Sequence, residues 1–129
     1  MAGYGPAVIK LVFCLTRKDG LSREEFQTYW RETHAPLVAE RAEVLRIRRY
    51  VQVHSLPAEA QVATRASRNA PEEFDGVAEL WWDSRDALAE NASNPAAAKA
   101  SAELLDDERN FIDLERSPLW WAEEHPIVG

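Results

Sequence analysis

The 129-residue sequence lacks the features by which several protein classes are recognised. Its single cysteine, Cys14, cannot form a disulfide within the chain, so we expect a reducing, cytoplasmic setting. No apolar stretch approaches the ~20 residues of a membrane-spanning helix, and the first residues lack the basic and apolar regions of a signal peptide. We therefore expect no membrane association.

Positive charge is also scarce. Fifteen Lys and Arg stand against 22 Asp and Glu, which gives a formal net charge of −7. Nucleic-acid-binding proteins neutralise phosphates with Lys and Arg, so this balance argues against a nucleic-acid partner. The sequence contains no glycine-rich phosphate loop, no G-x-S-x-G and no C-x-x-C. Phosphoryl transfer, dinucleotide chemistry and serine hydrolysis thus lack their usual markers.

The residues that are present indicate one globular domain, because 46% are hydrophobic and 29% are charged. We expect this domain to span residues 1–129, with a core at about 8–117 and a C-terminal tail at 118–129. Runs of β-branched and large apolar residues predict strands at residues 8–15, 45–54, 74–82 and 110–116. Helices are expected after the capping residues Ser22 and Asn94, with shorter ones at 37–44 and 85–91. Residues 55–73 show no clear hydrophobic periodicity, so no regular element is predicted there.

The predicted order is β-α-β-β-α-β, which is an α+β, ferredoxin-like plait with an antiparallel four-stranded sheet. Both helices of this plait cover one face of the sheet. The other face also needs cover, so we expect a homodimer formed by a two-fold contact through it. Trp120 and Trp121, in the expected tail, either wrap a partner subunit or fold back on their own core.

His34 is the first candidate for chemistry. Phe26, Trp30 and His34 recur every four residues and therefore share one helix face, and Pro36 predicts a break or kink at Ala35. An imidazole titrates near neutrality, so His34 suits the transfer of a proton to or from carbon. The alternative is a core histidine held by a backbone carbonyl.

A polar strand face supplies further candidates. Tyr50, Gln52 and His54 alternate along one side of the strand at residues 45–54, together with Arg48. This face lines a cavity if helices cover it, and is ordinary surface if they do not. In a cavity, Tyr50 would donate a hydrogen bond to a developing enolate or phenolate oxygen, and His54 would act as a second acid or base.

Glu79 lies in the middle of an apolar strand, where a carboxylate is costly unless it is paired. It either assists proton transfer or forms a salt bridge with Arg48 or Arg49. Four aromatic residues form either a substrate-binding wall or ordinary core, namely Phe13, Trp30, Trp81 and Trp82. We predict neither a bound metal nor a cofactor, because no short ligand spacing marks a site.

Three segments resemble the EthD family of the dimeric α/β-barrel superfamily. They are IKLVFCLTRKDGLSREEFQTYWRETHAPLV at residues 9–38, RRYVQVH at 48–54 and FDGVAELWWDS at 74–84. The most specific part is F-x-x-Y-W-x-x-x-H-A-P-L, from Phe26 to Leu37. The sequence has Val53 where the family pattern leads us to expect asparagine.

The resemblance implies a homodimer whose two sheets face each other, with a pocket between the sheet and the helices of each subunit. Enzymes of this superfamily catalyse different reactions and have none in common, so the fold alone does not identify the reaction. We expect a cofactor-independent enzyme that moves protons on an oxygenated cyclic small molecule, by isomerisation, cyclisation, dehydration or decarboxylation. The alternatives are a cofactor-independent monooxygenase of a phenolic substrate and a non-catalytic binding protein.

Overall fold

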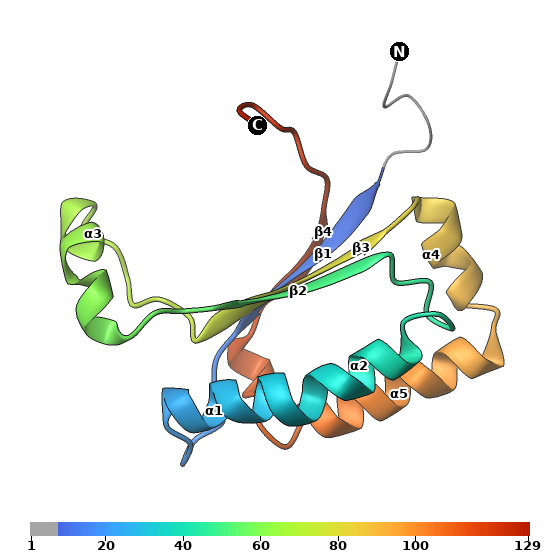
Figure 1. Ribbon diagram of the computed structural model, residues 1–129, viewed down its shortest axis with the longest axis horizontal. Helices are drawn as coiled ribbons and strands as arrows, with labels where there is room; N and C mark the ends of the chain where they lie inside the picture. The colour runs from blue at the N-terminus through green and yellow to red at the C-terminus, as the bar shows by residue number, and fades with distance from the viewer. Residues whose placement is uncertain (1–7) are drawn as a thin grey trace.

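The computed structural model describes residues 8–129 and contains one antiparallel sheet. Its strands are β1 (Ile9–Leu15), β2 (Arg49–His54), β3 (Gly76–Trp82) and β4 (Leu119–Ala122), in the spatial order β2-β3-β1-β4. The main helices lie below one face of this sheet, while α3 and the C-terminal segment extend beyond the other (Figure 1). The predicted α+β, ferredoxin-like fold with a four-stranded antiparallel sheet is confirmed.

The helix layer consists of two long stretches. The first combines α1 (Arg23–Tyr29), a π-helical turn (Trp30–His34) and α2 (Ala35–Arg41), and the second follows α4 (Arg85–Asn91) as α5 (Pro95–Glu108). The predicted capping box at Ser22 is present, with Glu25 as its second member. None of the helices described at residues 8–129 is long and apolar enough to span a bilayer.

Of the break or kink predicted at Ala35, the break does not occur, because the chain stays helical through Pro36. The amide of Ala35 donates to the carbonyl of Trp30, five residues earlier, which widens the helix into a π turn. Pro36 then falls in the first turn of α2, and the irregular hydrogen bonding of the π turn before it lets the helix continue past a residue that has no N–H.

The predicted fourth strand is also wrong. Residues 110–116 form a turn and a short 3₁₀ helix (Leu114–Arg116), and β4 begins only at Leu119, inside the expected tail. The reason is that Phe111 and Ile112 are consecutive and both almost fully buried, which a strand alternating between two faces would not allow. Trp121 of β4 packs edge-on against Trp82, with ring centroids 5.3 Å apart.

Two further boundaries differ from the predictions. Strand β2 begins at Arg49 rather than residue 45, because the chain turns at Arg46, whose φ is +59°. Residues 55–73 contain a 3₁₀ turn (Ala58–Gln61) and α3 (Val62–Ser67), which stands apart from the sheet (Figure 1).

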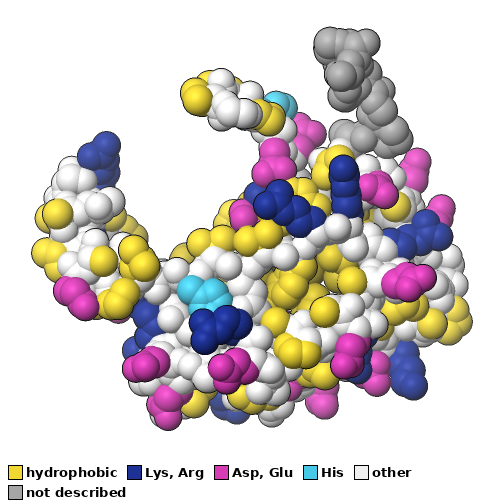
Figure 2. Space-filling model, viewed as in Figure 1, with side chains coloured by type: hydrophobic (Ala, Val, Ile, Leu, Met, Phe, Trp, Pro, Cys, Tyr) yellow, Lys and Arg dark blue, Asp and Glu magenta, His cyan; other side chains and the backbone are white. Residues whose placement is uncertain are grey.

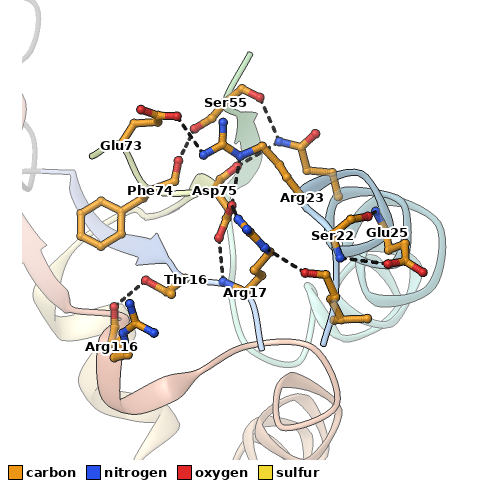
Figure 3. A network of polar contacts seen from close by, with 12 residues as sticks. Thr16, Arg17, Ser22, Arg23, Glu25, Ser55, Glu73, Phe74, Asp75 and Arg116 are labelled. Carbon is orange, nitrogen blue, oxygen red and sulfur yellow. Dashed lines mark hydrogen bonds and ion pairs between the residues drawn. The ribbon is translucent and has the colours of Figure 1, made fainter. Parts of the chain in front are cut away.

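Asp75 links several chain segments by hydrogen bonds at the end of the fold opposite α4. Its buried carboxylate accepts hydrogen bonds from the Arg17 amide at 2.7 Å, the Arg17 guanidinium at 2.6 Å and Arg23 Nε at 3.0 Å (Figure 3). These bonds join the chain after β1, the start of α1 and the entry to β3. We therefore assign Asp75 a structural role, since buried carboxylates need such partners.

Trp30 packs directly on the sheet at Gly76. A Cβ atom at position 76 would lie 2.5 Å from Trp30 Cζ3 and 2.8 Å from the carbonyl oxygen of Val53. Only glycine therefore lets the indole ring approach the backbone so closely at this point.

We expect Gly76→Ala to lower the free energy of unfolding by about 1–3 kcal/mol, because the added methyl group forces Trp30 away from the strand. Urea denaturation followed by circular dichroism measures this change. The cost should be smaller in a Trp30→Leu background, where the indole is gone. An equal cost in both backgrounds would contradict the packing argument.

Candidate functional site

A cavity of about 350 Å³ lies between the sheet and the helices. Figure 2 shows hydrophobic side chains gathered around a hollow between the level of β2 and that of α2. The cavity occupies the place where two apolar clusters meet: one around Phe26 and Trp30, the other around Val38 and Leu104. Its polar or titratable lining residues are His34, Tyr50, Asn91, Ser101 and Glu108.

The π turn places His34 at the cavity wall, where the residue is only 5% exposed. The imidazole Nδ1 lies 2.7 Å from Oδ2 of Asp107 on α5. Tyr29 donates its hydroxyl hydrogen to Oδ1 of the same carboxylate, also at 2.7 Å. Asp107 therefore connects the two long helical stretches and fixes the orientation of the His34 ring.

The environment favours a neutral His34 with its proton on Nδ1. Burial lowers the pKa of His34 below its ordinary value of 6.5, although Asp107 acts in the opposite direction. Burial tends to raise the pKa of Asp107, but hydrogen bonds from Tyr29, His34 and Asn110 hold that pKa below its usual value. Asp107 therefore accepts the Nδ1 hydrogen, and Nε2 keeps a lone pair. No hydrogen bond within residues 8–129 engages Nε2, so this atom can act as a base.

Tyr50 reaches the cavity from the helix-facing side of β2. The amide nitrogen of Gln52 donates to the Tyr50 hydroxyl oxygen at 2.7 Å and to the carbonyl of Trp30 at 2.9 Å. The carbonyl oxygen of Trp30 can only accept a hydrogen bond, so the atom of the Gln52 side-chain amide that faces it must be the nitrogen. The Tyr50 hydroxyl hydrogen is thus left for a ligand. Burial raises the pKa of Tyr50 above 10, which keeps this donor protonated.

Gln52 and His54 support Tyr50 from outside the cavity lining. Nε2 of His54 lies 2.8 Å from the amide oxygen of Gln52, and its ring stacks on Trp30 with centroids 4.4 Å apart. Both residues lie on the helix-covered face, as expected, but neither lines the cavity. His54 therefore positions Gln52, and through it Tyr50, rather than contacting a ligand there.

Glu79 and Trp81 lie on the opposite face of the sheet from the cavity, so the expectation that they join His34 in one pocket is wrong. Glu79 pairs with Lys10 at 2.8 Å instead of Arg48 or Arg49. The Trp81 ring lies between Lys10 and Arg49, each 4.7 Å from its centroid. The reason is strand parity, because residues 79 and 81 alternate with the cavity-lining residues Ala78 and Leu80.

The other predicted aromatic residues, Phe13, Trp30 and Trp82, do line the cavity, and all three are also buried in the core. Wall and core are therefore the same residues in this molecule. Within residues 8–129, no three His, Cys, Asp or Glu side chains come together as metal ligands would.

Two carboxyl groups of the site, Asp107 and Glu108, were not predicted. Both follow from the pattern of α5, whose buried residues Ala97, Ala100 and Leu104 are spaced by three and four. Continuing this spacing reaches 107 and 108, so carboxyl groups at these positions face the core. These two site residues could have been predicted from the sequence, because they are polar residues at positions that continue the apolar stripe of a helix.

The model of the EthD domain matches residues 18–115. The chain belongs to the EthD family. This confirms the resemblance seen in the motif around His34. The comparison with curated proteins gives no significant match.

Solved structures share the fold of this EthD protein at low sequence identity. An ethyl tert-butyl ether D family protein from Bacillus halodurans is 15% identical, with a TM-score of 0.60 over 92% of this chain and 99% of its own. A dimeric ferredoxin-like protein of unknown function from Bacteroides fragilis is 13% identical, with a TM-score of 0.57 over 94% and 100%. SnoaB, a cofactor-independent oxygenase from Streptomyces nogalater, is 12% identical, with a TM-score of 0.52 over 95% and 97%.

We expect Asp107→Asn to lower the pKa of His34 further, because the variant removes the negative charge that opposes the effect of burial. A titration followed by the ¹⁵N signals of the three histidines measures this change. His125 is exposed and serves as the internal control. An unchanged His34 titration would show that Asp107 does not act on the ring.

Proposed function

We propose that this EthD protein is a cofactor-independent enzyme that transfers protons on an oxygenated cyclic small molecule. The observation that carries the proposal is the convergence of two groups on one apolar cavity. His34, oriented by Asp107, offers a basic nitrogen, and Tyr50, oriented by Gln52, offers a hydroxyl hydrogen. Abstraction of a proton next to a carbonyl group needs these two groups.

The proposed reaction begins when the ligand carbonyl oxygen accepts a hydrogen bond from Tyr50. His34 Nε2 then takes the proton from the adjacent carbon, which forms an enolate and an imidazolium ring. Asp107 stabilises the positive ring, and Tyr50 stabilises the negative oxygen. Return of the proton to a different carbon completes an isomerisation. If the ligand carries a hydroxyl group on the β-carbon, the enolate expels it with cleavage of the C–O bond, and the proton from His34 converts it to water, which completes a dehydration.

The cavity supports a cyclic ligand by its size and its walls. Its volume of about 350 Å³ lies in the range of small-molecule sites. The rings of Phe13, Trp30 and Trp82 supply flat apolar surface. Asn91 adds a polar group, since its Oδ1 is buried without a partner among the described residues.

We expect wild-type protein to accelerate hydrogen–deuterium exchange at the α-carbons of 2-tetralone, a bicyclic ketone, in D₂O. His34→Gln should slow this exchange by about 100-fold or more, and Tyr50→Phe by about 10- to 100-fold. Proton NMR measures the rates. Because the pKa of His34 lies below 6.5, the wild-type rate should fall only below that pH.

His125→Gln is the matched control, because this histidine is exposed and lies outside the cavity lining. Exchange that survives His34→Gln would refute His34 as the base. Binding of 2-tetralone without exchange would instead favour a non-catalytic binding protein.

A second candidate function is cofactor-independent oxygenation of a phenolic substrate, which the shared fold of SnoaB favours. The same base would form a phenolate, and O₂ would then react with this anion in the apolar cavity. Oxygen uptake with a phenolic ligand such as 1,8-dihydroxyanthrone, without an added cofactor, distinguishes this function from proton transfer alone.

We also propose that the protein forms a homodimer through the open face of the sheet. Val53 on β2 and Trp120 on β4 are 45% and 48% exposed, so apolar side chains are exposed at both edges of this face. Two relatives with the same fold are dimeric. The sheet needs cover on this side because none of the helices at residues 8–129 lies on it (Figure 1).

We expect sedimentation velocity at micromolar concentration to give about twice the chain mass of 14.6 kDa. Val53→Asp should shift the protein toward the monomer, because it buries a charge at the contact. Ala98→Asp, on the exposed side of α5, should leave the mass unchanged. A monomeric wild type would contradict the proposed dimer.

A further inference from the structure

Glu108 is a titratable residue of the cavity that the proposed proton transfer does not use. It follows Asp107 at the end of α5, but the two carboxyl groups have different surroundings. Asp107 is held by Tyr29, His34 and Asn110. Glu108 lines the cavity, and its side chain makes no ion pair or hydrogen bond within residues 8–129. The residue is half-buried, so its carboxyl group is free to contact a ligand in the cavity.

The charges around Glu108 are unbalanced. On its own helix it is flanked by the carboxylate of Asp107 and by Arg109, which is exposed. From the elements packed against the cavity, it faces His34 of the π turn and Tyr50 of β2, and the environment of each favours the neutral form. The described lining contains no Lys or Arg. No cation in the cavity would compensate a ligand carboxylate beside Glu108.

We propose that Glu108 selects the charge of the ligand, because its carboxyl group donates a hydrogen bond to an oxygen of a ring compound when it is protonated and repels carboxylate ligands when it is ionised. This inference concerns the same cavity and rests on the proposed function for the identity of the site. It narrows the substrate class from oxygenated cyclic compounds in general to uncharged ones, such as ketones, esters, lactones and quinones.

The protonation of Glu108 makes the selection depend on pH. Burial and, to a smaller extent, the nearby charge of Asp107 raise the pKa of Glu108 to about 7, against the opposing effect of Arg109. Below pH 7 the carboxyl group is neutral and donates a hydrogen bond. Above pH 7 the Glu108 carboxyl group is negative. An anionic ligand can then bind only if Glu108 takes up a proton, which becomes less favourable as the pH rises. The affinity for a carboxylate should thus fall about tenfold between pH 6 and pH 8.

The test uses methyl 2-naphthoate and 2-naphthoate, which share one ring system and differ in charge. Isothermal titration calorimetry measures both affinities at pH 6 and pH 8, where 2-naphthoate stays ionised, so a pH effect on its binding belongs to the protein. We expect the wild type at pH 8 to bind the ester at least tenfold more tightly. Glu108→Gln, which keeps the size and a hydrogen-bond donor, should reduce this preference at least fivefold and abolish its pH dependence.

Glu103→Gln is the matched control, since Glu103 lies on the same helix but outside the cavity lining. It should behave as wild type. A second measurement follows the carboxyl ¹³C signals of glutamate, in which the signal lost in Glu108→Gln should titrate near pH 7. The proposal is overturned by tighter binding of 2-naphthoate, by unchanged selectivity in Glu108→Gln, by binding of neither ligand, or by titration of Glu108 near its ordinary pKa.

This result is separable from the proposed catalysis. Selective binding of the ester with no exchange of 2-tetralone would support the role of Glu108 and refute proton transfer on that ketone. Exchange that depends on His34, together with equal binding of both naphthalene ligands, would refute the role of Glu108 and leave the proposed proton transfer intact.

Discussion

The contact between Trp30 and the sheet is the constraint on which both the fold and the site depend. The indole ring lies against Gly76 and stacks on His54, so the helix approaches the backbone of the sheet closely at this point. The carbonyl of the same residue accepts hydrogen bonds from Ala35 and from Gln52. The first bond closes the π turn that ends at His34, and the second fixes the amide that leaves the Tyr50 hydroxyl free. One residue therefore sets the positions of both proposed reacting groups.

The burial of two consecutive carboxyl groups at the end of α5 explains how one short segment serves two purposes. Asp107 has three donors and stays ionised, which suits the orientation of an imidazole ring. Glu108 has none within the described residues, and its pKa near 7 leaves it free to change charge with its surroundings. The difference arises from partners rather than from residue type, as the physical chemistry of buried acids requires.

The sequence predicted the elements of the fold where periodicity and capping agreed. Ser22 and Glu25 marked the start of α1, and the alternation of Tyr50, Gln52 and His54 identified the covered face of β2. It misplaced β4, because Phe111 and Ile112 are as apolar as strand residues although both point into the core. Only the pairing of Leu119–Ala122 with β1 distinguishes the real strand, and such pairing is a long-range property.

The candidate site was predictable to a similar extent. Local spacing predicted that His34 and Trp30 share one helix face and that Tyr50 lies on a polar strand face, whereas Phe13 was named only for its aromatic ring; all four line the cavity. Glu79 and Trp81 were misplaced because the parity of β3 was not related to that of its neighbours. Asp107 was missed because its importance comes from contacts with residues 73 and 78 positions earlier in the chain.

The location of the cavity between two hydrophobic clusters has a consequence for how such a molecule can diversify. Tyr50 and Leu80 contact both clusters, so the cavity lies at the boundary between two hydrophobic clusters and not inside one of them. Substituting a side chain at this boundary changes the shape of the cavity, while each cluster keeps most of its own contacts. New ligand preferences can then accumulate in descendants of one ancestor before the scaffold itself becomes unstable.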